Sequence, residues 1–323
     1  MILRPLHISL LVSFLCFLGA SCQKDKRDYN VQLHQLPTEL ALTDVYFISA
    51  DTGFVTAGNL FSAGLVCGTT DAGLHWDTLL QTGQGCNSIS YHKNQLCISE
   101  CGNKFHFTDD FVNWSYYSSS GWWRWHQHTW LPNDQLILVG GGNFGDGHIH
   151  QKEPGNNKLV RSDSIQFELM DISYCSNGKL ITVGYGLIMT STDAGLSWQI
   201  SPVEGDFFRG VDFPTNQTGY VVGEYGSVYK TSNNGQDWQK IRASNSIFSN
   251  QSTLLRDIAF INEQTGLIVG RNNTVLRTDN GGKSWQRVEN LTDPVDINKI
   301  TIAYNKAYLA GDYGKLLILN LDN

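Results

Sequence analysis

The stretch GWWRWHQHTW, residues 121–130, holds the densest group of side chains that could bind a ligand. Trp122, Trp123 and Trp125 offer flat apolar faces on which sugars or peptide side chains stack. Arg124 adds a cation among them. Aromatic side chains gathered at a surface are typical of an interaction site. The same residues could instead fill the core at the start of a strand, so their role depends on the element that contains them.

Histidines two residues apart suggest metal binding, because alternate residues of a strand point to the same side. His126 and His128 form one such pair, and His148 and His150 form another. We expect the pairs on two strands with a third strand between them, roughly 9–10 Å apart. The sequence therefore predicts no metal site, and we expect no cofactor.

The composition is that of a globular protein. The 323 residues are 41% hydrophobic and 16% charged, and 23 Lys and Arg against 30 Asp and Glu give a net charge of −7. No basic block interrupts this balance, so a nucleic-acid partner is not expected.

The N-terminus has the pattern of an export signal. Arg4 precedes an apolar run from Ile8 to Leu18, which is too short to span a bilayer comfortably. Gly19-Ala20-Ser21 then leads to Cys22, which resembles the lipobox of bacterial lipoprotein precursors, although Leu18 lies one place early. We expect residues 1–21 to be a signal peptide, Cys22 to be lipidated and residues 22–28 to be a tether. The alternative is simple secretion with Cys22 as a free thiol.

One motif recurs along the rest of the chain, with Ser or Thr seven residues before a Trp, Asp or Asn five before it, and Gly three before it. Its short polar side chain can accept hydrogen bonds from the amides of its own turn, the Gly can take positive φ, and the Trp opens the next strand. A weaker copy, FTDDFVNW at 107–114, keeps Asp109 but has Phe111 in place of Gly. The full copies are TTDAGLHW (69–76), STDAGLSW (191–198), TSNNGQDW (231–238) and TDNGGKSW (278–285).

The repeat spacing of about 40 residues with four short strands per unit predicts an all-β fold, a seven-bladed β-propeller. The last unit stops before its outer strand, and the alternating stretch YNVQLHQLP at 29–37 can supply it and close the ring. Residues 29–323 are thus expected to form one domain. The expected units are 42–80, 87–119, 123–163, 168–203, 206–244, 253–291 and 296–321.

These motifs resemble the Asp boxes of sialidase-type propellers and, more closely, the repeats of the Ycf48 family of photosystem II assembly factors, over residues 42–321. The resemblance implies that the rim opposite the Asp boxes carries function, and that arginines on this rim contribute to partner binding. Arg209 and Arg256 match the arginine positions, whereas Thr43, Asn87, Met170 and Asn298 occupy them in other units. A photosynthetic partner is therefore in doubt.

We therefore expect an exported, lipid-anchored, monomeric and non-catalytic module that binds a protein or a glycan on this rim. The alternative is a sialidase-like glycoside hydrolase, with Arg124, Arg209 and Arg256 around a substrate carboxylate and Tyr225, Glu224 and Asp312 as catalytic groups. The candidate partner-binding residues are Trp122, Trp123, Arg124, Trp125, Tyr185, Arg209, Glu224, Tyr225, Arg256, Arg271, Asp312 and Tyr313.

Two further expectations concern this rim: a disulfide and the register of the tryptophan stretch. Cys86, at the entry of the first strand of the second unit, and Cys101, in the turn between its second and third strands, are predicted to form a disulfide. The tryptophan stretch fits two registers: Arg124 can match Arg209, or Trp130 can match Tyr174. In the second register Gly121 to Trp125 would form a loop over the rim.

Overall fold

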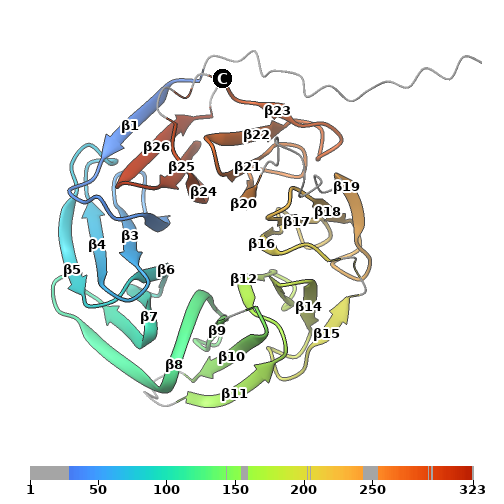
Figure 1. The fold of residues 1–323 in the computed structure, drawn as a ribbon, viewed down its shortest axis with the longest axis horizontal. Coiled ribbons are helices and arrows are strands. Elements are labelled where there is room, and N and C mark those ends of the chain that lie inside the picture. The colour runs from blue at the N-terminus through green and yellow to red at the C-terminus, as the bar shows by residue number, and fades with distance from the viewer. Residues whose placement is uncertain are drawn as a thin grey trace, which may run out of the picture.

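The chain folds into a ring of β-sheets around a central axis (Figure 1). The computed structural model describes residues 29–142, 144–153, 159–201, 203, 205–242, 254–289, 291 and 294–321, and the backbone alone at 119–123 and 159–163. Within these residues every regular element is a strand, which confirms the all-β prediction. No helix in this part of the chain is long and apolar enough to cross a membrane.

Five of the sheets have four strands each, ordered from the axis outward. Neighbours in sequence pair within each sheet, as expected of propeller blades, except that β1 pairs with β26. Their strands are β2 (Leu42–Phe47), β3 (Gly53–Asn59), β4 (Ala63–Thr69) and β5 (Asp77–Thr82); β12 (Leu169–Tyr174), β13 (Leu180–Gly184), β14 (Leu187–Ser191) and β15 (Gln199–Ser201); β16 (Phe208–Asp212), β17 (Gly219–Gly223), β18 (Val228–Thr231) and β19 (Gln239–Arg242); β20 (Leu255–Phe260), β21 (Gly266–Gly270), β22 (Thr274–Thr278) and β23 (Gln286–Arg287); and β24 (Ile297–Ala303), β25 (Lys306–Gly311), β26 (Lys315–Asn320) and β1 (Val31–Gln35).

The sixth sheet has six strands, so the prediction of seven separate four-stranded blades is wrong. β7 contains both middle strands expected of the second unit, including the turn expected at Glu100 and Cys101. β8 begins as the outer strand of that unit and continues without a break as the inner strand of the next, pairing first with β7 and then with β9. Five four-stranded blades and one joined sheet result. The strands of the joined sheet are β6 (Cys86–His92), β7 (Gln95–Thr108), β8 (Ser115–Trp130), β9 (Leu136–Gly142), β10 (Asp146–Lys152) and β11 (Leu159–Ile165).

The N-terminal strand closes the ring, as predicted. β1 pairs antiparallel with β26 from Val31 opposite Leu319 to Gln35 opposite Lys315. Tyr29 and Leu36 flank the strand and are 3% and 2% exposed, and each packs into a different core cluster. Pairing the two ends of the chain covers what would otherwise be an open sheet edge.

The Asp boxes form the turns between the third and fourth strands of their sheets, as the repeat predicts. In the first, Asp71 Oδ1 accepts hydrogen bonds from Thr69 Oγ1 (2.8 Å) and His75 N (2.9 Å), and Trp76 Nε1 donates to Gly73 O (3.0 Å). Gly73 has φ 92°, a conformation that side chains disfavour. In the weaker copy, the carboxylate that accepts the amide hydrogen bonds of the turn belongs to Asp110 rather than to Asp109.

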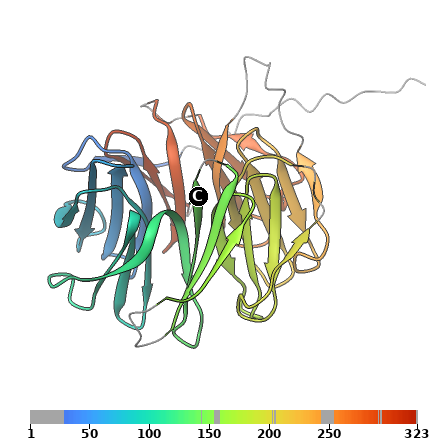
Figure 2. The ribbon, with the colours of Figure 1, turned by 60° about the horizontal axis from the view of Figure 1, so that its bottom comes forward.

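The turns gather on two opposite faces of the ring, which Figure 2 shows from an oblique direction. We call one of them the box face. It holds the Asp boxes together with the turns between first and second strands. The two kinds of turn are hydrogen-bonded to each other, as when Asn234 N donates to Gln217 O (2.9 Å). We call the other the mouth face: it holds the turns between second and third strands and the segments that lead into the innermost strands, as Tyr185 paired with Phe207 shows.

The predicted disulfide between Cys86 and Cys101 is absent, since both are free thiols. Cys86 lies directly opposite Glu100 in the ladder between β6 and β7. Adjacent residues of a strand point to opposite faces of the sheet, so Cys101 faces away from Cys86. Burial raises the pKa of the Cys86 thiol to about 12, which makes it unreactive.

Candidate functional site

The innermost strands all carry a β-bulge at the same place, at their second residue on the mouth face. In β16, for example, Phe208 pairs with Gly223 and Gly210 with Val222, so Arg209 has no partner in the ladder. A bulged residue is free to turn its side chain away from the sheet. The bulged residues are Thr43, Asn87, His126, Met170, Arg209, Arg256 and Asn298.

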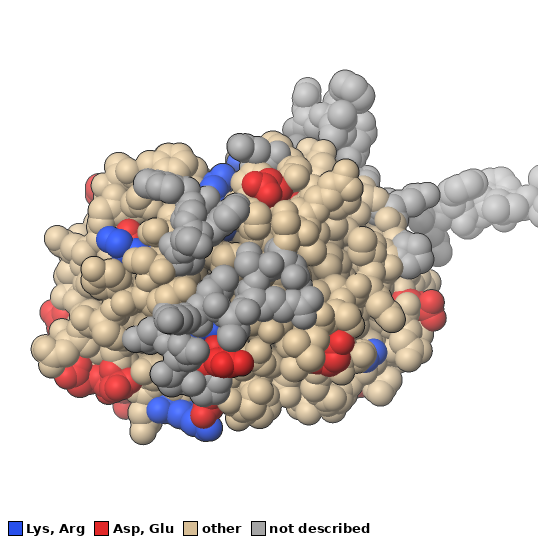
Figure 3. All heavy atoms as spheres, turned by 90° about the horizontal axis from the view of Figure 1, so that it is seen from below, with Lys and Arg blue, Asp and Glu red and all other residues tan. Residues whose placement is uncertain are grey.

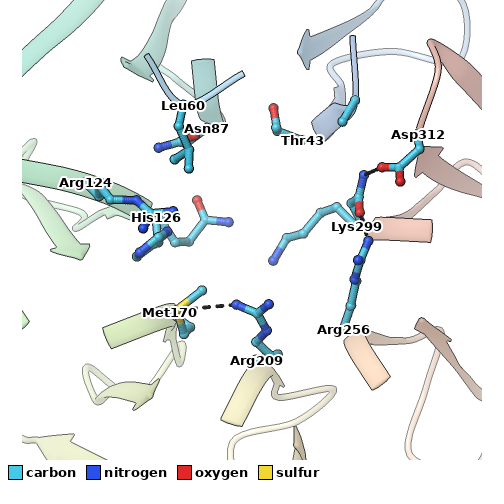
Figure 4. A pocket seen from close by; sticks show the side chains of 13 residues that line it. Thr43, Leu60, Asn87, Arg124, His126, Met170, Arg209, Arg256, Lys299 and Asp312 are labelled. Carbon is cyan, nitrogen blue, oxygen red and sulfur yellow. Dashed lines mark hydrogen bonds between the residues drawn. The ribbon is translucent and has the colours of Figure 1, made fainter. Parts of the chain in front are cut away.

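All of these bulged residues line one cavity of about 470 Å³ at the mouth of the central channel (Figure 4). Three of them bind the backbone of the neighbouring innermost strand and so hold the ring together: Thr43 Oγ1 donates to Cys86 O (2.6 Å), Asn87 Nδ2 to Trp125 O (2.7 Å) and Asn298 Nδ2 to Leu42 O (2.8 Å). The remaining four, His126, Met170, Arg209 and Arg256, give this cavity its chemical character.

Four cations converge on the mouth cavity: Arg124, Arg209, Arg256 and Lys299. Arg209 Nε lies 3.1 Å from Glu224, and Arg256 Nη2 lies 3.2 Å from Asp296. For Arg124, no carboxylate lies within ion-pairing distance in the described part of the chain. By contrast, the side wall of the ring in Figure 3 carries scattered acidic and basic side chains, several of them next to one another. In a chain with a net charge of −7, the mouth thus gathers four cations; Arg209 and Arg256 are already paired with carboxylates, and Arg124 is placed to attract an anionic group.

A ring of carboxylates lies below the mouth. Each accepts an amide hydrogen bond from the neighbouring innermost strand and so joins two sheets at the axis. The pairs are Asp44 with Ile89 (3.0 Å), Asp171 with Val211 (3.1 Å), Asp212 with Phe260 (2.7 Å) and Asp257 with Ile300 (2.9 Å). Because the first, second and fourth of these side chains are buried, they need a positive partner when ionised.

Lys299 is that partner. Its ammonium lies 3.3 Å from Asp171 and 3.4 Å from Asp257, between the mouth cavity and the channel. Burial raises the pKa of Asp44 to about 6 and that of Asp257 to about 7. Burial alone disfavours the ammonium, but the carboxylates of Asp171 and Asp257 raise the pKa of Lys299 above its usual value. The lysine therefore stays charged at neutral pH and holds the carboxylate ring together.

Most of the predicted partner-binding residues lie on or beside the mouth. Arg124, Arg209, Arg256 and Asp312 line the cavity. Glu224 pairs with Arg209, and Arg271 lies 3.6 Å from Asp296, which also binds Arg256. Three tyrosines stand exposed on turns around it: Tyr185 (42%), Tyr225 (41%) and Tyr313 (60%).

The tryptophan stretch adopts the register in which Trp130 matches Tyr174, because Trp125 pairs with Gly140 as Leu169 pairs with Gly184. The expected loop does not form, since these residues continue β8. Trp125 is wholly buried, so its assignment to a partner-binding surface is wrong. The side chains of Trp122 and Trp123, like the lipidation site Cys22, lie outside the described residues.

Sequence reasoning missed two residues of the mouth, His126 and Lys299. His126 occupies the place equivalent to Arg209, and its Nε2 lies 2.8 Å from the buried carboxylate of Glu168. The repeat alignment could have revealed it once the second register was chosen. Lys299, in the strand INKITIA, has no sequence signal, since its partner Asp171 is 128 residues away.

The alternative catalytic and metal sites gain no support from the geometry. Glu224, the expected activator of Tyr225, instead faces Arg209. Asp312 accepts a hydrogen bond from Asn298 Nδ2 (2.8 Å). His126 and His128 turn to different partners, Glu168 and Ser88. The described residues contain no group of three or more His, Cys, Asp or Glu side chains arranged to hold a metal ion.

A β-propeller with Asp-box turns and a cationic mouth is the class that this fold and site define. The sequence matches the family described as photosynthesis system II assembly factor YCF48 over residues 57–229 and 246–322. The chain belongs to this family, which confirms the resemblance seen in its repeats.

Solved structures share the fold at low sequence identity. One titled "YCF48 bound to D1 peptide" is 16% identical with a TM-score of 0.73, and the match covers 94% of this chain and 100% of that one. YCF48 from Cyanidioschyzon merolae is 17% identical with a TM-score of 0.70, covering 91% and 99%. Virginiamycin B lyase from Staphylococcus aureus is 11% identical with a TM-score of 0.72, covering 91% and 100%. No curated protein sequence matches the chain.

Proposed function

We propose that this chain is an exported, lipid-anchored and non-catalytic propeller that binds a protein partner at its mouth. The observation that carries the proposal is the convergence of Arg124, Arg209, Arg256 and Lys299 on one cavity of an acidic chain. A related structure in the family holds a D1 peptide, which supports a peptide segment of a protein as the ligand. The anionic groups of such a segment would complement the mouth.

The geometry also favours binding over catalysis. The acidic side chains nearest the arginines are engaged in ion pairs or hydrogen bonds, as Glu224 is with Arg209 and Asp296 with Arg256. A general acid or base must instead reach a reacting group with a suitable proton. The carboxylates of the mouth therefore act as positioning partners of the arginines.

Neutralising two cations of the mouth tests the binding proposal. We expect Arg124→Gln with Arg209→Gln to reduce the partner recovered after crosslinking in intact cells by about tenfold, since charged contacts in a desolvated interface contribute strongly. The measurement is quantitative mass spectrometry of the crosslinked complexes, with circular dichroism showing that the fold persists.

Lys93→Gln with Lys283→Gln, on turns of the box face, makes the same change in net charge and should leave recovery unchanged. Equal recovery of the partner with the mouth variant and with the wild type would contradict the proposal. Loss with both double variants would point to long-range charge rather than to the mouth.

The anchor is tested separately at Cys22. We expect Cys22→Ser to move the protein from the membrane fraction to the soluble extract almost completely, because the acyl chains on this cysteine are the membrane attachment that we propose. Fractionation and immunoblotting measure this, and intact mass should show acyl chains on the wild type alone. A wild-type protein already found in the soluble extract, with an unmodified cysteine, would contradict the anchor.

A further inference from the structure

Three aromatic rings form a cluster beside the mouth, which we call the aromatic clasp: Phe144, Tyr185 and Phe207. Their ring centroids lie 5.3, 5.5 and 5.4 Å apart in the three pairs. Phe144 is 54% exposed and Tyr185 42%, while Phe207 is buried beneath them. Exposed aromatic groups of this kind are normally interaction surfaces.

Phe144 is held in place by its backbone. Its φ is 63°, a conformation that bulky residues rarely adopt. Glu168 fixes it from both sides, because Glu168 N donates to Phe144 O (3.2 Å) and Glu168 Oε2 accepts from Phe144 N (3.2 Å). The other oxygen of this buried carboxylate lies 2.8 Å from His126 Nε2 in the mouth. One side chain thus positions both the clasp and a residue of the mouth.

The clasp and the mouth form one continuous surface. The guanidinium of Arg209 lies 4.7 Å from the ring centroid of Phe207 and also lines the mouth cavity. Next to it, Met170 contacts Arg209 through its sulfur at 3.7 Å. A ligand whose anionic group lies over Arg209 therefore has an apolar surface within reach.

Exposed aromatic side chains are more numerous on the turns of the mouth face than on those of the box face. Its turns expose the rings of Phe61 (67%), Tyr225 (41%) and Tyr313 (60%) besides the two of the clasp. The turns of the box face differ. Among their described residues, one Phe, Tyr or Trp side chain is exposed to this degree, that of Tyr304 (50%). Exposed aromatic rings are thus concentrated on the face that carries the cations, whereas the box face mainly exposes aliphatic side chains such as Leu74 (65%), Val112 (76%) and Leu196 (56%).

We infer that the aromatic clasp receives a large apolar or aromatic side chain of an extended partner segment whose acidic residues lie over the cations of the mouth. This inference rests on the proposed function and adds the chemistry of the partner. The ring planes meet at 49°, 72° and 74°, which makes a corner for one side chain rather than a flat platform for a sugar. The cations of the mouth complement acidic residues of the partner segment.

The test uses a fluorescein-labelled peptide of about ten residues, long enough to reach roughly 30 Å when extended. It carries one phenylalanine near one end, aspartates near the other, and Gly and Ser elsewhere; a matched peptide has Ala in place of the phenylalanine. Anisotropy gives Kd for each peptide with the wild type, Phe144→Gly, and Arg124→Gln with Arg209→Gln. Glycine keeps the positive φ without strain, so Phe144→Gly removes the ring alone.

We expect Phe144→Gly to weaken the phenylalanine peptide about fivefold to tenfold and to leave the Ala peptide unchanged, which is the signature of a direct contact. The arginine variant should weaken both peptides. Tyr304→Gly removes an exposed ring at φ 50° on the box face and should affect neither peptide.

The outcomes separate the inference from the proposed function. If Phe144→Gly has no effect, or weakens both peptides equally, while the arginine variant still weakens both, the clasp is wrong and the mouth stands. If neither peptide binds, both are wrong. Binding of cellohexaose that is lost in Phe144→Gly, without peptide binding, would overturn the inference in favour of a glycan.

Discussion

Replacing Lys299 by Met is expected to lower the free energy of unfolding at pH 8 by about 3–5 kcal/mol, because removal of one partner leaves buried charges uncompensated. Lys299 lies within 3.4 Å of Asp171 and Asp257, whose side chains are 5% and 3% exposed. Urea unfolding followed by tryptophan fluorescence measures the change.

The loss should depend on pH in a defined direction. The carboxyl of Asp257 has a pKa near 7 and that of Asp44 near 6, both raised by burial, and loss of the ammonium would raise them further. A carboxyl with a raised pKa in the folded state favours folding while protonated, and this contribution is lost as the pH rises from about 4 through the folded-state pKa. At pH 5 we expect Asp44 and Asp257 of the variant to be mostly neutral, so a large part of its deficit should disappear.

Two further variants show whether charge is the cause. Lys299→Arg keeps the cation and should recover much of the stability, whereas Lys306→Met, at the start of β25, should cost little. A deficit in Lys299→Met that is equal at pH 5 and pH 8 would show that lost packing, not the ion pairs, explains it.

Deleting residues 29–36 is expected to unfold or aggregate the ring. The deletion removes two side chains that are almost completely buried, Tyr29 and Leu36, and exposes β26 along its whole length. Each lost side chain costs about 2–5 kcal/mol, against a typical total stability of 5–15 kcal/mol. Thermal unfolding and size-exclusion chromatography measure the effect.

A synthetic peptide of residues 29–37 offers a matched rescue, because it can pair with β26 and restore the missing edge. The same peptide with Leu36→Asp should fail, since Leu36 enters the core while Leu33 is 40% exposed. A deletion variant that stays monomeric with an unchanged Tm would show that the ring does not need this strand.

The local parts of the fold were predictable because each depends on neighbouring residues. Asp71 bonds a residue four positions away, so the Asp box is visible as a motif. Alternation in YNVQLHQLP likewise indicates a strand, although it does not identify the core residues, since Leu33 is 40% exposed and Leu36 is buried. The joined sheet was not predictable in this way: β8 pairs with β7 and β9 in turn, and a pattern of alternating side chains does not record which strand lies beside it.

The site was predictable to the extent that it repeats. Arg209 and Arg256 stand at equivalent places in the repeats, so alignment placed both. His126 was missed because two registers fitted the tryptophan stretch, and the choice depends on the pairing of Trp125 with Gly140. Phe144 and Lys299 derive their roles from Glu168 and Asp171, which are distant in sequence, and neither residue belongs to a motif.

The bulges at the mouth have a consequence for how this family diversifies. Because the bulged residue has no partner in the hydrogen-bond ladder, His126, Met170, Arg209 and Arg256 can occupy equivalent positions without any change in the strands behind them. Mutation can thus change these four positions one at a time at little risk to folding, whereas Thr43, Asn87 and Asn298 also join neighbouring strands. Relatives with one scaffold can therefore evolve toward different partners, and the residues at these positions are the ones to compare among them.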